Sequence, residues 1–224
     1  MSETAQGRGS RRPEALDRDR VLASAVALAD TDGLGAVTMR SLAQALGVKP
    51  MSLYHYVRGK EDLLDGMVDL VFGQIDLPEV DKPWRTEIRR RAVSARTVLA
   101  RHPWALALMD TRTTPGPGTL RHHDSVVGVL MNNGFSPAMT ERAYVIIDAY
   151  VYGFVLQEAS LPFDDQGDAA QAVASAMAGF DGGLYPHLAA FANGHLMRAD
   201  YAFGEQFGPG LDLVLDMVGA LADP

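Results

Sequence analysis

The chain has 224 residues, of which 47% are hydrophobic, no cysteine, and a formal net charge of −8. This length allows one core of moderate size or two modest ones. The lack of cysteine excludes disulfides and thiolate metal sites. No apolar run reaches the roughly 18 residues that span a bilayer, and the N-terminus lacks the apolar region of a signal peptide. We therefore expect a cytoplasmic protein without a membrane partner.

Residues 1–13 are polar, contain glycine and lack periodicity, which predicts a disordered arm. Arg8, Arg11 and Arg12 lie just before the first predicted helix, where a basic arm could reach a phosphate or the minor groove of DNA. A solubilising tail is the alternative interpretation.

Residues 14–75 have the pattern of a small helical domain. Apolar residues at helical spacing predict an amphipathic helix over 14–32, ended by Gly33, and a helix with a broad apolar face over 61–74. Residues 1–75 contain nine Lys or Arg and ten Asp or Glu, so this part of the chain is near neutral. The negative charge therefore lies mainly in the rest of the chain. Any contact with phosphate would then depend on local clusters of cations.

Between those two helices, the sequence predicts a helix-turn-helix. A helix is expected over Met39–Leu46, because its apolar residues recur at helical spacing, and Gly47 is the expected C-cap. Pro50 suits the first turn of a second helix, expected over Pro50–Val57. Two helices joined by such a short turn can place the second one in the major groove of DNA.

The second helix has an outer face suited to DNA. Leu53 and Val57 would face inward, and Ala43 and Gly47 are small where the two helices would approach closest. The outer side chains offer a cation and hydroxyls for phosphates and aromatic rings for sugars: Lys49, Met51, Ser52, Tyr54, His55 and Tyr56. A short helical hairpin with an incidental aromatic face is the alternative.

The run from Arg20 to Leu70 closely resembles the DNA-binding domain of the tetracycline-repressor (TetR) family. A first helix that ends in D-G is followed by T-M-R-S-L-A-Q-A-L-G-V, S-L-Y-H-Y-V and K-E-D-L-L, in the family's order and spacing. The resemblance implies a homodimeric, ligand-responsive transcriptional regulator. Such proteins are usually repressors that bind a double-stranded DNA operator with two-fold symmetry. In the family, the helix predicted here at 61–74 links the DNA-binding domain to the body and transmits ligand occupancy.

The resemblance also implies which residues contact DNA. It places Thr38 and Arg40 near DNA at the start of the first motif helix, and Lys60 on a phosphate at the start of the next helix. It places Lys49, Pro50, Met51 and Ser52 at the tip of the recognition helix and Tyr54, His55 and Tyr56 along its groove face. Tetracycline repressors proper carry a Gln before a Pro-Thr pair at the tip and a Trp-His pair further along. This chain has Pro50, Met51 and Ser52 at the tip, then His55 and Tyr56. These differences leave the operator sequence open.

Residues 76–83 contain two prolines among acidic residues and predict a linker to a second domain at 84–224. Six helices are expected there, with a loop at 111–118: 84–100, 104–109, 120–132, 136–159, 169–179 and 205–221. The basic run in the first of them, Arg85 to Arg96, is typical of a solvated face. The 136–159 helix is apolar on most sides, so it should be buried on two. We expect it to join the last helix in a four-helix homodimer interface.

The second domain also resembles the ligand-binding domain of tetracycline repressors, through N-G-F-S at 133–136 and Y-G-F-V-L-Q-E at 152–158. The drug–magnesium ligands of those proteins fall at about Leu108, Ala149 and Gln157, which cannot provide them. We therefore expect no metal site, no cofactor, and a small apolar or ring-containing effector in place of tetracycline. The candidate pocket residues are Trp104, Met109, Arg112, Met131, Asp148, Tyr150, Tyr152, Gln157 and Met177. The alternative is that the Met and aromatic side chains are plain core, which is the commoner case at helical spacing, and that Asp148 and Arg112 pair with a neighbour or with solvent.

An enzyme is disfavoured, because the sequence lacks the nucleophile-elbow, zinc-protease, phosphate-loop and CxxC motifs. His122 and His123 are adjacent, and neighbouring helical residues point about 100° apart, which is poor geometry for one metal ion. A helical protein-interaction module is a third possibility, and would need a large exposed apolar stripe. The sequence thus predicts an all-α, two-domain DNA-binding regulator.

Overall fold

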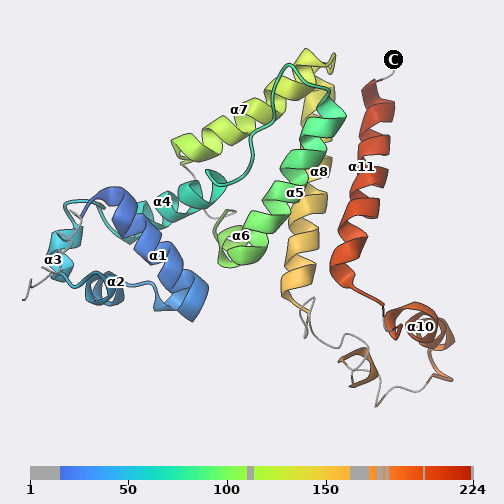
Figure 1. Cartoon of the computed structure of the whole chain (residues 1–224), viewed down its shortest axis with the longest axis horizontal. Helices are drawn as coiled ribbons and strands as arrows, with labels where there is room; N and C mark the ends of the chain where they lie inside the picture. Colours follow the sequence, from blue (N-terminus) through green and yellow to red (C-terminus); the bar gives the residue numbers. More distant parts are fainter. Residues whose placement is uncertain are drawn as a thin grey trace, which may run out of the picture. The chain divides into compact units, whose positions relative to one another are not determined.

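A computed structural model describes residues 16–109, 114–161, 172–175, 179, 182–198 and 200–222. The described residues form helices, turns and loops with no strand, so the all-α prediction is confirmed (Figure 1). The chain divides into two compact units, Met1–Met67 and Val68–Pro224, and the division falls inside helix α4 (Lys60–Phe72). Among the described helices, none combines the length and the hydropathy needed to cross a bilayer.

The first unit contains α1 (Arg18–Asp32), a 3₁₀ turn η1 (Leu34–Ala36), α2 (Met39–Leu46), α3 (Pro50–Leu53) and the first two turns of α4. Each of the four α-helices contributes apolar side chains to a common core: Val21, Leu22, Ala25, Val26, Ala29, Leu42, Ala43, Leu53, Leu63, Leu64 and Met67. This core is the support on which the helix-turn-helix rests.

The helix ends of this unit follow local chemistry. The Asp17 carboxylate accepts the backbone N–H of Arg20 at 2.8 Å, so α1 begins at Arg18, later than the expected residue 14. Thr38 and Ser41 form a reciprocal capping box at the start of α2. Gly47 ends α2 with a φ of 68°, the left-handed conformation that a Cβ disfavours. A Cβ built there meets no atom, so Gly47 is needed for its φ and not for close packing as expected.

The recognition helix is shorter than the sequence predicts. α3 ends at Leu53, and the chain continues through residues 54–56 as turns. Here the N–H groups of His55 and Tyr56 bond to carbonyls three residues back, at 3.4 Å and 2.9 Å, which winds the backbone more tightly than an α-helix. The expectation of a helix to Val57 was therefore wrong in conformation, although Leu53 and Val57 face inward as predicted.

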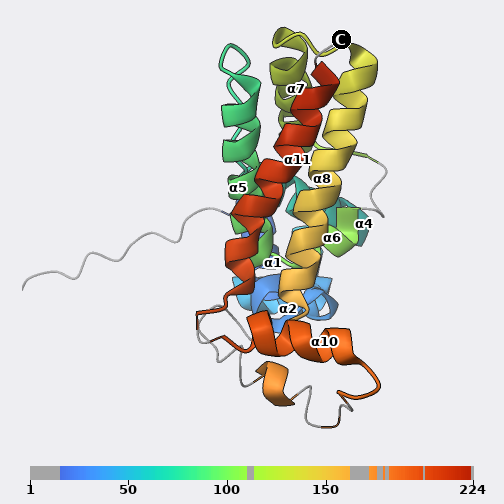
Figure 2. The same cartoon turned by 90° about the vertical axis from the view of Figure 1, so that its right-hand side faces the viewer.

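The second unit contains α5 (Trp84–Arg101), α6 (Trp104–Met109), α7 (Pro117–Asn132), α8 (Pro137–Ala159), α10 (Pro186–Phe191), a π-helical turn η2 (Ala192–Leu196), η3 (Phe203–Gln206) and α11 (Phe207–Ala222). Figures 1 and 2 both show α5, α8 and α11 running side by side. Of the helix expected at 169–179, residues 172–175 are helical and most of the remainder lies outside the described residues.

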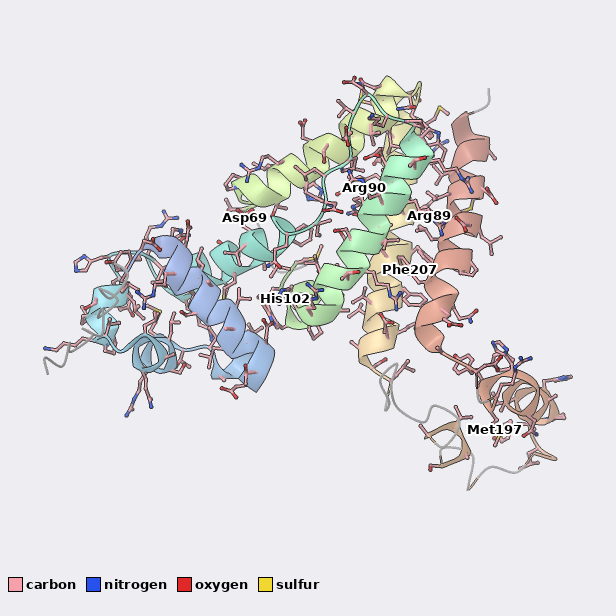
Figure 3. All side chains as sticks on the ribbon, viewed as in Figure 1. Asp69, Arg89, Arg90, His102, Met197 and Phe207 are labelled. Atoms are coloured by element: carbon pink, nitrogen blue, oxygen red, sulfur yellow. The ribbon has the colours of Figure 1, made fainter. Side chains whose placement is uncertain are left out.

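α7 begins at Pro117, three residues earlier than predicted, because a side chain of α4 caps it. The Asp69 carboxylate accepts the N–H groups of Gly118 at 3.1 Å and Thr119 at 2.7 Å, and the Thr119 hydroxyl at 3.0 Å (Figure 3 labels Asp69). A negative charge at a helix N-terminus is favourable. A Cβ on Gly118 would lie 2.7 Å from the backbone oxygen of Asp69, so only glycine permits this approach. α4 and α7 are thereby joined.

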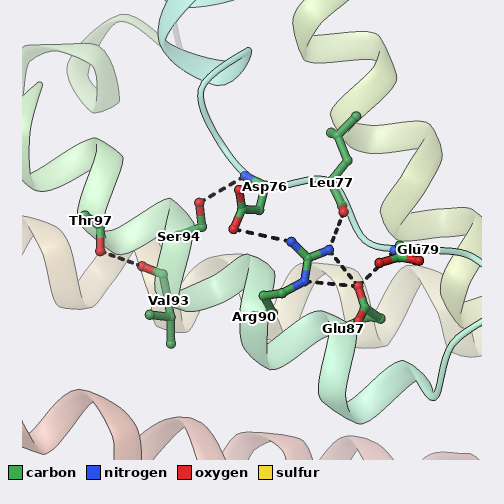
Figure 4. Close-up of polar contacts among 8 residues, drawn as sticks. All are labelled: Asp76, Leu77, Glu79, Glu87, Arg90, Val93, Ser94 and Thr97. Atoms are coloured by element: carbon green, nitrogen blue, oxygen red, sulfur yellow. Dashed lines mark hydrogen bonds and ion pairs between the residues drawn. The ribbon is translucent and has the colours of Figure 1, made fainter.

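The predicted linker, residues 76–83, is held against α5. Figure 4 shows the guanidinium of Arg90 between the Glu87 carboxylate at 2.7 Å, the Leu77 carbonyl at 2.6 Å and Asp76 at 3.3 Å. Glu87 also accepts the N–H of Glu79 at 2.9 Å. Arg90 and that N–H hold the pKa of the Glu87 carboxyl below its usual value. The segment is therefore anchored by charged hydrogen bonds.

Candidate DNA-binding surface and effector site

The side chains predicted to contact DNA lie on the surface of the first unit. Met51 is 74% exposed and Tyr54 47%. Ser52 and Tyr56 are half-buried, and the other predicted contacts are exposed: Thr38, Arg40, Lys49, Pro50, His55 and Lys60. Directly beneath them, Leu53 and Val57 are fully buried. This arrangement presents a mixed cationic, hydroxyl and aromatic surface above buried apolar side chains, which suits a DNA groove.

Arg18 fixes the end of the predicted recognition segment, Lys49–Tyr56, a role that the sequence did not reveal. Its guanidinium donates to the Tyr56 carbonyl at 2.8 Å and forms a bidentate pair with Asp62 at 2.9 Å and 3.1 Å. Asp62 also accepts the backbone N–H of Arg58 at 2.8 Å. The hydrogen bond from Arg18 lowers the pKa of Asp62 to about 2. α1, the recognition segment and α4 are thus connected by one ionic cluster.

The second unit contains a buried polar cluster, which we call the Arg91 cluster: Arg91 of α5, His122 and His123 of α7, and Tyr144, Asp148 and Tyr152 of α8. Arg91 is 0% exposed and donates to the Asp148 carboxylate at 2.6 Å, to His122 Nε2 at 2.8 Å and to the Tyr152 hydroxyl at 3.4 Å. Its assignment to a solvated face was wrong, because a buried carboxylate compensates its charge.

Burial and this central charge shift the titration of the surrounding groups. Burial, followed by the charge of Arg91, lowers the pKa of His122 to about 3. Burial also lowers the pKa of His123 and raises those of Tyr144 and Tyr152. Burial opposes the charge on Arg91, but Asp148 overcomes it and raises the pKa of the guanidinium. At neutral pH the cluster therefore combines one buried ion pair with uncharged imidazoles and phenols.

Two buried side-chain nitrogen or oxygen atoms in the described part of the chain have no hydrogen-bond partner, and one of them is His122 Nδ1. The other is the hydroxyl of Thr140. An unpaired buried donor typically costs about 1–3 kcal/mol. Thr140, Tyr144, Asp148 and Tyr152 are spaced four residues apart on α8 and so share one face of that helix. The period of four is the sequence signal for this polar stripe, of which the predicted effector residues include only Asp148 and Tyr152.

The remaining predicted effector residues are not gathered at the Arg91 cluster. Trp104 is buried on α6 with its ring 6.1 Å from that of His102, and Met109 is half-buried. The Tyr150 hydroxyl donates to the Phe207 carbonyl at 2.8 Å, and the Tyr150 ring packs against the Phe207 ring between α8 and α11. Met131 and Gln157 are exposed. Arg112 and Met177 lie outside the described residues, as does the basic arm at 1–13.

A surface groove of about 580 Å³ follows the outer side of α5. Arg89, Arg90 and Arg101 contribute to its wall, with Val93 and Thr97 between them. Arg89 is paired with Asp212 of α11, and Arg90 holds the linker. Two of the three arginines of the groove therefore already form ion pairs within the protein. The Arg91 cluster is the stronger candidate for recognition of a small molecule.

No group of three or more His, Asp or Glu side chains in the described ranges is arranged to hold a metal ion. Of the three positions that the resemblance aligns with the drug–magnesium ligands of tetracycline repressors, Leu108 is buried, and Ala149 and Gln157 are exposed.

The sequence of the second unit matches a known family over residues 77–221, described as "Tetracyclin repressor-like, C-terminal domain". The chain belongs to the TetR family. Residues 21–67, which include the exposed recognition segment, match "Bacterial regulatory proteins, tetR family". This TetR-family protein is thus a DNA-binding transcriptional regulator, and the predicted family resemblance is confirmed.

Its relatives are regulators as well. An "HTH-type transcriptional regulator" of Saccharopolyspora erythraea is 35% identical over 201 residues, which cover 88% of this chain and 85% of the relative. The "HTH-type transcriptional repressor DrrR1" of Streptomyces coeruleorubidus is 36% identical over 149 residues, which cover 65% of this chain and 55% of that protein. The crystal structure of Streptomyces coelicolor ActR in complex with actinorhodin has the same fold, with a TM-score of 0.76 at 22% identity over 94% of this chain and 100% of ActR.

Proposed function

We propose that this TetR-family protein is a repressor that binds a two-fold symmetric operator as a homodimer. We further propose that it leaves DNA when a small ring-containing molecule binds at the Arg91 cluster. The observation that carries the proposal is the recognition surface, an exposed Lys49–Tyr56 segment held on buried Leu53 and Val57. The name of the DrrR1 relative supports repression.

Dimer formation is supported by unpaired apolar side chains on two neighbouring helices. Val145 and Leu156 on α8 are 58% and 54% exposed, and Leu213 and Met217 on α11 are 72% and 49% exposed. Their spacings of eleven and four residues place each pair along one side of its helix. α8 and α11 pack together, so a second copy could cover both stripes in a four-helix interface.

The effector assignment is supported by the chemistry of the Arg91 cluster, since ligand sites are mostly apolar with a few convergent polar groups. Several relatives are tetracycline repressors, and the ActR structure contains actinorhodin. Two contacts would connect this site to DNA binding. The ring of Phe72 on α4 packs edge-on against His122 with centroids 5.5 Å apart, and Asp69 on α4 caps α7. A ligand that displaces α7 would therefore move α4, which continues into the DNA-binding unit.

Selection of bound DNA from a random duplex pool tests the proposal. We expect an inverted repeat whose half-sites are read by two recognition segments. Lys49→Ala and Lys60→Ala should weaken binding and reduce its salt dependence by about one phosphate contact each. Arg121→Ala, which removes an exposed cation from α7, is the matched control and should change neither. Binding without sequence preference would reject the operator function and favour an interaction module.

A further inference from the structure

The hydrogen-bond geometry at His122 fixes which ring nitrogen carries a proton. Arg91 Nε–H donates to His122 Nε2 at 2.8 Å. A guanidinium stays protonated and only donates, so Nε2 must be the nitrogen with a free lone pair. A neutral imidazole carries its single proton on the other nitrogen, which makes His122 Nδ1 an N–H donor. The low pKa of the ring, about 3, keeps it neutral at physiological pH.

That donor has nothing to donate to within the part of the chain that the structure describes. The residue is fully buried, and its ring neighbours are aromatic: Phe72 and His123, each with its centroid 5.5 Å away. An unpaired N–H among aromatic rings is an unfavourable arrangement unless a ligand supplies an acceptor.

We infer that the Nδ1–H of His122 recognises the effector, and that the effector is a ring compound with an oxygen acceptor, such as a ketone, quinone or phenolate. The inference rests on the proposed function of the Arg91 cluster as the effector site. A cationic ligand is disfavoured because the guanidinium of Arg91 lies beside the imidazole. A metal chelate at this nitrogen is excluded because a proton occupies the lone-pair position. A pure hydrocarbon would leave the donor unpaired.

The cluster offers a route from the surface to His122. His123, Tyr144 and Tyr152 are only half-buried. The Tyr144 hydroxyl is hydrogen-bonded to His123 Nδ1, and the His123 ring packs against that of His122. Rotation of Tyr144 and His123 would expose the buried donor to a planar molecule and retain aromatic surfaces on which its rings could stack.

The test compares two soluble probes that differ only in their ring carbonyls, anthraquinone-2-sulfonate and anthracene-2-sulfonate. The full chain lacks cysteine, so the quinone cannot form thiol adducts. Affinities are measured by calorimetry at pH 7. We expect the quinone to bind about 5- to 30-fold more tightly, the factor associated with one satisfied buried hydrogen bond. His122→Phe should abolish this preference, and His122→Gln, which can both accept and donate, should retain it.

His187 on α10, an exposed histidine outside the Arg91 cluster, is the matched control. His187→Phe should leave the preference for the quinone intact. Nitrogen NMR of the ligand-free wild type checks the tautomer without depending on the folding of any variant. A proton on Nε2 of His122 would overturn the inference. Equal binding of both probes would also overturn it and leave the effector site standing, whereas binding of neither would reject the Arg91 cluster as that site.

Discussion

The two units hold their functional side chains in opposite ways. In the first, the recognition segment lies on the surface, and the devices that shape it are close in the chain: the Thr38 cap, the Gly47 turn and Pro50. In the second, the polar side chains are buried and come from three helices, with Arg91 and Asp148 separated by 57 positions. Local caps and turns shape most of the recognition segment, and one distant pair, Arg18 with Asp62, holds its end. The interior site instead depends throughout on distant residues that compensate one another.

The largest expected effect is in the interior site. Asp148→Ala would leave the guanidinium of Arg91 buried without its carboxylate, which typically costs about 3–5 kcal/mol. Urea unfolding followed by tryptophan fluorescence measures this, because Trp84 and Trp104 both lie in the second unit. The double variant Arg91→Met, Asp148→Leu should recover most of the loss, since it removes both charges. A loss below about 1 kcal/mol for Asp148→Ala would mean that Arg91 is compensated elsewhere.

Two positions of the recognition segment, Met51 and Leu53, allow a sharper contrast between stability and recognition. Leu53→Ala deletes a fully buried side chain and should destabilise the first unit by about 2–5 kcal/mol. Met51→Ala changes a side chain that is 74% exposed, so stability should stay within about 0.5 kcal/mol. Met51→Ala should nevertheless alter the selected operator sequence. Hydrogen exchange in the first unit measures stability, and the duplex pool measures recognition. An unchanged operator would remove Met51 from the contact surface.

The two units should lose stability at different pH values as the solution is acidified. The pKa of His122 is about 3 in the folded protein against an ordinary 6.5, so the unfolded chain binds its proton first and stability falls as the pH drops from about 6.5 toward 3. The pKa of Asp62 is about 2 against 3.8, so its contribution to the first unit is lost only between about 4 and 2. Unfolding curves at stepped pH should show the second unit weakening first. His122→Phe should reduce the upper slope, and Asp62→Asn the lower one.

The smallest expected effect comes from the helix caps. Thr38→Ala removes the cap of α2 and Ser136→Ala the cap of α8, and each should cost about 1 kcal/mol of stability in its own unit. Only Thr38→Ala should weaken operator binding, because α2 positions the recognition segment. Thr38→Ser keeps the capping oxygen and serves as the control. Equal losses of DNA affinity for the two alanine variants would show that stability alone governs binding.

The sequence by itself determined the all-α class, the order of the helices and the family, because these depend on patterns confined to short stretches. The glycine stop at Gly47 and the apolar periodicity act over one or two turns. The buried Leu53 and Val57 and the exposed residues around them followed from the same periodicity. The early start of α7 was missed because its capping group, Asp69, lies 49 positions away from Gly118.

Only the tertiary structure decided the character of the basic run in α5. Arg85, Arg89 and Arg90 remain partly exposed in ion pairs, whereas their neighbour Arg91 is fully buried. Helical spacing places Arg91 three residues from Ile88 and four from Ala95, on the buried face of α5. The run does not show how a charge is compensated there, because its partners His122 and Asp148 are 31 and 57 positions away. A charge can be buried only where its partners converge, and that convergence exists only once the helices are packed.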